Sequence, residues 1–226
     1  MSLTTGRGPL SGRPAGRFTA PIPDHVAYIE PFRRRVRATK DGRTIVDSER
    51  VLLVHREGRP PTYAFPVGDV EGTPAEPEPD VTGYVTVPWN AVDSWFEEGE
   101  EVFGHPRNPY HRVDHLHSRR HLHVEAGGIA LVDTDDTMAV YETSLEPRLY
   151  VDPRFVRVDL LTMSATHTYC PYKGTATYWT ARVGGEDLED IAWSYEDPLP
   201  EFAPLAHFLS FDEARVAVEH DLPAAG

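Results

Sequence analysis

Cysteine and lysine are scarce in this sequence, and their scarcity excludes several kinds of site. Among 226 residues there is one cysteine, Cys170, and there are only two lysines, Lys40 and Lys173. A single cysteine cannot form a disulfide within the chain or supply a cysteine-rich zinc site. Acidic residues outnumber basic ones, 36 to 22, which gives a formal net charge of −14. Such an acidic surface repels phosphate backbones, so we expect no nucleic-acid partner.

Long apolar runs are also missing. No stretch reaches the roughly 18 apolar residues of a membrane-spanning helix, and the sequence begins MSLTTGRGPLSGRPAGRF, without the apolar segment of a signal peptide. We therefore expect a soluble, cytoplasmic protein with no membrane contact. Residues 1–24 are rich in glycine, proline and arginine and are predicted to be a flexible leader.

The most informative feature of the sequence is an internal repeat. When the chain is displaced by 86 positions, residues 36–70 align with residues 122–156 without a gap. Turn residues coincide as well as apolar ones, and Gly42 falls on Gly128. The shared pattern is a strand, a glycine turn, a second strand that ends in Val-Asp-Ser or Val-Asp-Thr, and a third strand. A repeat of this kind indicates two related structural units.

We interpret the repeat as a duplication, with residues 25–118 as a degenerate first copy and residues 119–226 as a complete second copy. The copies diverge beyond the aligned part. There the first copy has an acidic, proline-rich stretch, Glu71–Thr82, which is predicted to be a solvated loop. Trp95 and Trp193, each in an aromatic and acidic run, are expected to correspond.

The fold class is predicted to be mainly β, as two related small antiparallel β domains with few short helices. With 21 prolines and 17 glycines, turns should be frequent and long helices absent. Strands are expected at Val156–Leu161, where apolar residues alternate, and at Thr175–Val183, which is rich in β-forming residues. Short helices are expected at Ala91–Glu98 and Pro204–Leu209.

Cys170 and Lys173 lie in the segment Cys-Pro-Tyr-Lys-Gly, which is predicted to form a tight hairpin loop. Pro171 favours an extended Cys170, and Gly174 can adopt the positive φ that ends the turn. A nearby ammonium favours a cysteine thiolate, so both residues are catalytic candidates. His167 would face the opposite side of a regular strand from Cys170, which argues against a local Cys–His dyad. The competing interpretation is a buried, inert cysteine and a solvated lysine.

The hairpin and its surroundings resemble a known family. Four segments are similar to the family called domain of unknown function 427: Cys-Pro-Tyr-Lys-Gly at 170–174, Ala-Thr-Tyr-Trp at 176–179, Ala-Trp-Ser-Tyr at 192–195 and Asp-Pro-Leu-Pro at 197–200. The resemblance covers about residues 122–218, and a shortened copy without the hairpin motif covers about residues 36–113. It implies a compact β domain but no known reaction. A nucleotidyltransferase label sometimes given to the family has no support in the motifs of this sequence.

Histidines are concentrated in residues 105–123, at His105, His111, His115, His117, His121 and His123. Each of two His-Leu-His pairs places two imidazoles on one strand face, a spacing that can chelate a metal. Arg119 and Arg120 lie between the pairs, where positive charge opposes a cation. We therefore predict no metal and no cofactor. The cluster would change charge between pH 5 and 8.

The leading prediction is that the second copy binds a small molecule near the Lys173 hairpin, with Lys173 suited to an anionic group. The candidate ligand-binding residues, chosen mainly on the resemblance, are Lys173, Tyr172, Trp193, Tyr195 and Arg148. Two alternatives stay open. One is an enzyme with Cys170 as nucleophile, and the other is a non-enzymatic module that binds a protein partner. The reaction, if there is one, and the ligand do not follow from the sequence.

Overall fold

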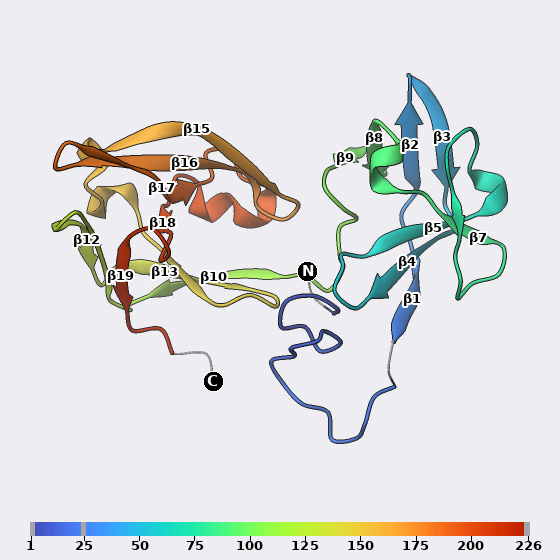
Figure 1. Ribbon diagram of the computed structural model, residues 1–226, viewed down its shortest axis with the longest axis horizontal. Helices are drawn as coiled ribbons and strands as arrows, with labels where there is room; N and C mark the ends of the chain where they lie inside the picture. The colour runs from blue at the N-terminus through green and yellow to red at the C-terminus, as the bar shows by residue number, and fades with distance from the viewer. Residues whose placement is uncertain (1–2, 24–25, 224–226) are drawn as a thin grey trace. The chain divides into compact units, whose positions relative to one another are not determined.

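The chain forms two compact units, unit 1 (residues 1–111) and unit 2 (residues 112–226), in a computed structural model that describes residues 3–23 and 26–223. The described residues form short strands that pair antiparallel, and their helical structure is limited to short 3-10 turns (Figure 1). The prediction of a mainly β fold is confirmed. None of the described helices is long and apolar enough to cross a membrane.

Unit 1 contains two sheets that share one hydrophobic core. The first has the order β1–β4–β5–β7–β6, with β1 Ala27–Phe32, β4 Val51–Arg56, β5 Thr62–Pro66, β6 Glu76–Pro77 and β7 Tyr84–Thr86. The second has the order β3–β2–β8–β9, with β2 Val36–Lys40, β3 Arg43–Ser48, β8 Ser94–Glu97 and β9 Glu100–Val102. Two 3-10 turns, η1 Val67–Asp69 and η2 Trp89–Ala91, complete the elements of this unit. The core joins both sheets through side chains such as Phe65 and Trp95.

Unit 2 contains three sheets. The first, β10–β13–β14, consists of β10 Val113–Ser118, β13 Thr137–Glu142 and β14 Arg148–Tyr150. The second, β12–β11–β19, consists of β11 Leu122–Ala126, β12 Ile129–Thr134 and β19 Ala217–His220. The third, β15–β16–β17–β18, consists of β15 Leu161–Cys170, β16 Gly174–Val183, β17 Glu186–Ser194 and β18 Ser210–Phe211. The 3-10 turns are η3 Pro153–Phe155, η4 Val158–Leu160 and η5 Pro200–Leu205.

The two units contain matching strand pairs. The hairpins β2–β3 and β11–β12 have the same register, and each has a bulge at the same place, after Ala38 and after Val124. The pairs β1–β4 and β10–β13 also match, because every strand of the second pair begins and ends 86 residues after its counterpart and pairs in the same register. The structure thus repeats the strand pattern seen in the sequence, and the interpretation of the repeat as a duplication stays a prediction.

The units differ in the segment that follows β5 in unit 1 and β14 in unit 2. Unit 2 has three long strands there, β15, β16 and β17, which lie side by side (Figure 1). Trp193 belongs to this additional sheet. Trp95 instead lies opposite Ala38 of β2, and the equivalent strand of unit 2 is β19, where Val218 lies opposite Val124. The expected correspondence of Trp95 with Trp193 is therefore wrong.

Of the two strands predicted from local pattern, one is confirmed. Thr175–Val183 lies within β16. The expected strand Val156–Leu161 is wrong, because Val158–Leu160 forms the turn η4, in which the N–H of Leu160 donates to the carbonyl of Arg157 at 3.0 Å. Alternation over six residues did not distinguish this turn from an extended strand.

The two predicted helices differ from the structure in type or position. Within Ala91–Glu98, strand β8 replaces the expected helix, because the buried side chains of Trp95 and Glu97 alternate with half-buried ones as a strand requires. Pro204–Leu209 only overlaps a helical element. That element is η5, Pro200–Leu205, which buries Phe202 and Leu205.

The acidic stretch of unit 1 is attached to strand β4, and the N-terminal segment is attached to the turn that follows β4. Glu78 is buried and forms an ion pair with Arg56 of β4, so Glu71–Thr82 is not the wholly solvated loop that its composition predicted. Near the N-terminus, the carbonyl of Thr4 accepts a hydrogen bond of 2.9 Å from the N–H of Gly58. Residues 1–2 and 24 of the predicted leader lie outside the described residues.

Candidate functional site

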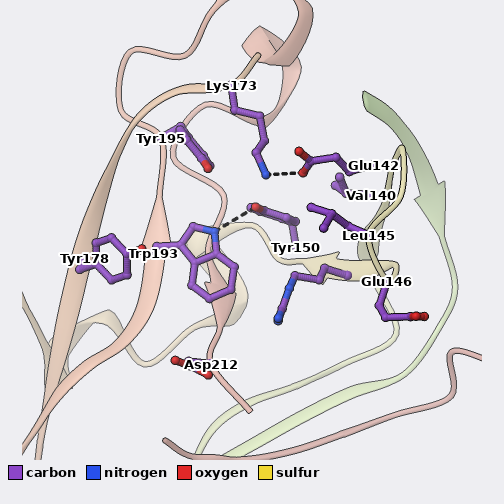
Figure 2. A pocket seen from close by; sticks show the side chains of 11 residues that line it. Val140, Glu142, Leu145, Glu146, Tyr150, Lys173, Tyr178, Trp193, Tyr195 and Asp212 are labelled. Carbon is purple, nitrogen blue, oxygen red and sulfur yellow. Dashed lines mark hydrogen bonds and ion pairs between the residues drawn. The ribbon is translucent and has the colours of Figure 1, made fainter. Parts of the chain in front are cut away.

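A cavity of about 490 Å³ lies in unit 2, between the sheet β10–β13–β14 and the additional sheet β15–β18 (Figure 2). Strands β13 and β14 supply one side of the lining. The turn between β15 and β16, strands β16 and β17 and the chain after β17 supply the other. The lining residues on which its chemistry depends are Glu142, Arg148, Tyr150, Lys173, Trp193 and Tyr195.

The β15–β16 hairpin holds Lys173 at this cavity. Cys170 lies opposite Gly174 at the end of the hairpin, and Gly174 has φ of +102°, as the sequence predicted. The carbonyl of Lys173 accepts a hydrogen bond of 3.0 Å from the N–H of Leu199, which fixes the turn against the chain after β17. The side chain of Lys173 points inward and is only 13% exposed, so the interpretation as a solvated turn residue is wrong.

Lys173 forms a buried ion pair with Glu142 of β13. Its Nζ donates to Oε2 of Glu142 at 2.6 Å, and the carboxylate side chain is 9% exposed. The ammonium also lies 5.7 Å from the ring centre of Tyr195 and 5.9 Å from that of Phe202, within the range of cation–π attraction. The lysine charge is therefore already balanced by a carboxylate and two aromatic rings.

The protonation of Lys173 follows from its surroundings. Burial by itself lowers the pKa of this ammonium, but the oxygens of Tyr150, Tyr195 and Glu142 outweigh burial and raise the pKa above its ordinary value. Lys173 consequently stays protonated at neutral pH. As a catalytic candidate it can donate hydrogen bonds there but cannot act as an uncharged amine.

Two tyrosines flank the ion pair. Tyr150 is buried, and its hydroxyl oxygen accepts a hydrogen bond of 3.0 Å from Nε1 of Trp193. Tyr195 is 5% exposed, and no residue in the described part of the chain is hydrogen-bonded to its hydroxyl. Burial is the main cause that raises the pKa of both phenols, so both hydroxyls carry a proton at neutral pH.

Arg148 supplies a second cation. Its guanidinium lies 5.2 Å from the ring centre of Trp193, and Nη1 is 3.5 Å from the carboxylate of Glu213. Both charged side chains are about half exposed, and such ion pairs contribute little to stability. Compared with Lys173, Arg148 is therefore the cation that can exchange its partner more easily.

The structure brings together four of the predicted site residues, Lys173, Trp193, Tyr195 and Arg148, around the cavity. Two others lie outside its lining. Tyr172 is buried, and Cys170 is half-buried at the end of β15. Sequence reasoning missed Glu142 and Tyr150. Tyr150 is two residues after the predicted Arg148, whereas nothing near Glu142 in the sequence indicated its role.

The histidine-rich segment does not form a metal centre in the described residues, where no group of three or more histidine, cysteine or acidic side chains is arranged to hold a metal ion. One of its histidines instead binds a carboxylate. Nδ1 of His121 lies 2.7 Å from Asp135, and this hydrogen bond raises the pKa of the exposed imidazole.

Comparison with known proteins gives one family. A family model described as "Domain of unknown function (DUF427)" matches residues 28–97 and residues 114–222. One matched segment falls in each unit, which is consistent with a tandem arrangement of the domain. No curated protein matches the chain.

Proposed function

The chain belongs to the DUF427 family, and from the cavity in its second unit we propose that it binds a small organic anion. One observation carries the proposal: the ion pair of Lys173 and Glu142 is buried and forms part of the cavity wall. Removing two charges from water is costly, and apolar residues of similar volume would often stabilise a fold as well or better. A charged pair on a cavity wall is therefore better explained by ligand recognition than by stability.

The size and walls of the cavity suit a small molecule. Its volume of about 490 Å³ lies within the range of roughly 300–1,000 Å³ that is typical of ligand pockets. Trp193, Tyr178 and Tyr195 supply aromatic surface. The charged lining residues are Glu142, Glu146, Arg148, Lys173 and Asp212. Aromatic walls with polar groups that fix the orientation of a ligand are common in small-molecule sites.

Arg148 is the group that we assign to the anion. Lys173 was the expected anion-binding residue, but Glu142 already neutralises it. Arg148 is paired only loosely with Glu213, and a ligand carboxylate or phosphate can replace that partner with two parallel hydrogen bonds. Of the lining carboxylates, Asp212 already accepts a hydrogen bond from the N–H of Ala214 and lies 3.3 Å from Arg215.

The experiment is a thermal-shift screen of small carboxylates, organic phosphates and amines of similar size. The wild type is compared with Arg148→Gln and with Arg182→Gln, a control on β16 whose arginine is exposed and outside the cavity lining. An anion at 100 times its Kd should stabilise the wild type and the control by about 2.7 kcal/mol. Arg148→Gln should bind it at least about tenfold more weakly, because a charge-assisted pair is lost.

Three results contradict the proposal: no organic anion stabilises the wild type, amines stabilise it as well as acids do, or Arg148→Gln responds like the control. The other two hypotheses, a nucleophilic Cys170 and a protein-binding module, have no comparable support among the described contacts.

A further inference from the structure

Hydrogen-bond donors converge at the inner end of the cavity. The ammonium of Lys173 has three N–H groups, and only one of them donates to a described residue, Glu142. The hydroxyl of Tyr195 has no partner in residues 3–23 and 26–223. The hydroxyl of Tyr150 accepts from Trp193, so its own proton lacks an acceptor there. Figure 2 shows both phenol oxygens directed toward the ammonium of Lys173.

Among the described residues, none of these donor groups is a fully buried atom without a partner; they are accessible from the cavity that they line. Tyr150 is 1% exposed and Tyr195 is 5% exposed. A donor on a cavity wall can bond to water or to an acceptor of a ligand that replaces the water. Because the donors line a cavity, an acceptor brought by a ligand is the simplest partner for them.

The charge at this end indicates which acceptor fits. Lys173 and Glu142 sum to zero, so a ligand carboxylate placed beside Lys173 would also lie close to the carboxylate of Glu142. Like charges in a buried site repel strongly. A neutral carbonyl oxygen avoids this repulsion and still accepts two hydrogen bonds. The full negative charge of the ligand is then left for Arg148.

We propose that the inner end of the cavity holds a neutral carbonyl oxygen, which accepts hydrogen bonds from Tyr195 and Tyr150 beside the ammonium of Lys173. The ligand class is accordingly an organic acid with a carbonyl group at its far end, such as a keto acid, with the acid group at Arg148. This assignment rests on the proposed function, because it concerns the same cavity. It makes Tyr195 a specificity-determining residue.

The test uses two aromatic acids of nearly equal size, 4-acetylbenzoate and 4-isopropylbenzoate, which differ in the carbonyl oxygen. Their dissociation constants are measured by NMR titration of the full chain. The wild type should bind 4-acetylbenzoate about tenfold more tightly, since about 1.4 kcal/mol of hydrogen bonding is at stake. Tyr195→Phe keeps the ring and should remove most of this preference. Tyr141→Phe, on the exposed part of β13, should keep it.

Four outcomes overturn the assignment. The first is equal affinity of the wild type for the two acids. The second is a preference for 4-acetylbenzoate that persists in both Tyr195→Phe and Tyr150→Phe. Two variants are used so that the test remains possible if one of them is unstable. Binding of neither acid by a protein that gives hits in the thermal-shift screen overturns the carbonyl assignment alone. Absence of hits in the screen overturns the proposed function as well.

Discussion

Arg56 and Glu142 occupy the same position in two matching strands and carry opposite charges. Arg56 is the last residue of β4 and Glu142 the last of β13, and each lies opposite the first residue of its partner strand. Each is also joined to the segment in which the units differ. Arg56 pairs with Glu78 of the acidic stretch, and Glu142 pairs with Lys173 of the hairpin.

The shared position explains how an ion pair that joins two segments of the chain can also line a pocket. In both units the ion pair fastens the strand end to the connecting segment. Only Glu142 and Lys173, however, line the cavity described in unit 2, because the long strands β15 to β17 stand opposite β13 and β14 there. The additional sheet thus supplies Lys173 and places its ion pair with Glu142 at the wall of the cavity.

Removal of one partner of the Lys173–Glu142 pair should lower the free energy of unfolding much more than removal of both partners. Glu142→Gln leaves the ammonium of Lys173 buried without a counter-charge, and the free energy of unfolding should fall by about 3–5 kcal/mol. Replacement of both residues, Glu142→Leu with Lys173→Met, should recover most of this loss. Urea unfolding followed by tryptophan fluorescence measures both changes.

A matched control is the exposed pair Arg157 and Asp159, for which Arg157→Gln should cost no more than about 1 kcal/mol. If Glu142→Gln and the control have equally small effects, Lys173 must find solvent or another acceptor. The ion pair would then not be the buried pair that the structure shows.

The hairpin and the repeat could be predicted because their signals are local. Cys170, Pro171 and Gly174 determine a turn within five residues, and the geometry of that turn was correct. The repeat was visible because glycine and aspartate turn residues recur in the same register as the apolar ones. Turn chemistry of this kind depends on φ preferences, which single residues carry with them.

The site could be predicted only in part, because its other half is formed by distant contacts. Glu142 is 31 positions from Lys173 in the sequence, and only the pairing of sheets brings them together. The alternation at Val156–Leu161 was misleading for a related reason: a short pattern specifies no register and so fits a 3-10 turn equally well. Trp95 was matched to Trp193 by composition alone, which strand pairing contradicts.

Gly174 should be the least replaceable glycine of the hairpin region. A Cβ at this position would lie 3.3 Å from the backbone nitrogen of Leu199, and φ is +102°. Gly174→Ala therefore combines backbone strain with a tight contact against the main chain of Leu199. Gly185→Ala, at φ of +87° with nothing within 4 Å, has strain alone.

Strain of this kind costs about 1–3 kcal/mol, and Gly174→Ala should lower the free energy of unfolding by more than the Gly185 variant does. Urea unfolding of both variants measures the difference. Gly174→Ala should also weaken binding of any hit from the thermal-shift screen, because the turn holds Lys173. Equal stability of the two variants would contradict the close approach of residues 197–199 to the hairpin.

Cys170 should be dispensable for ligand binding. Its side chain is half-buried at the end of β15 and does not line the cavity. Cys170→Ser should therefore retain the thermal shift given by each hit from the screen. A ligand lost from this variant, or a covalent adduct on Cys170 seen by intact-mass measurement after incubation with a hit, would instead support the nucleophile hypothesis.

The stability of unit 1 should fall as the pH decreases below neutrality, because of His55. This side chain is fully buried, with Nε2 3.0 Å from the carboxylate of Glu30, and the rings of Tyr28 and Tyr110 lie 5.7 and 5.8 Å from it. Nδ1 has no hydrogen-bond partner among the described residues. Burial lowers the pKa of His55 more than Glu30 raises it.

The folded state therefore prefers a neutral His55, whereas the unfolded chain takes up a proton at about pH 6.5. The stabilisation that neutral His55 gives to the folded state is present above that pH. It is lost as the pH falls from there toward the lower pKa of the folded state. The free energy of unfolding then changes by at most about 1.4 kcal/mol per pH unit for one proton. Urea unfolding at a series of pH values between 5 and 8 should show this loss in the wild type and a flatter profile in His55→Leu. His121→Gln is the control, because His121 has the opposite pH dependence. The pKa of exposed His121 is raised, so the contribution of His121 to the free energy of unfolding disappears as the pH rises. A His55→Leu profile parallel to that of the wild type would mean that His55 is protonated equally easily in the folded and unfolded chain.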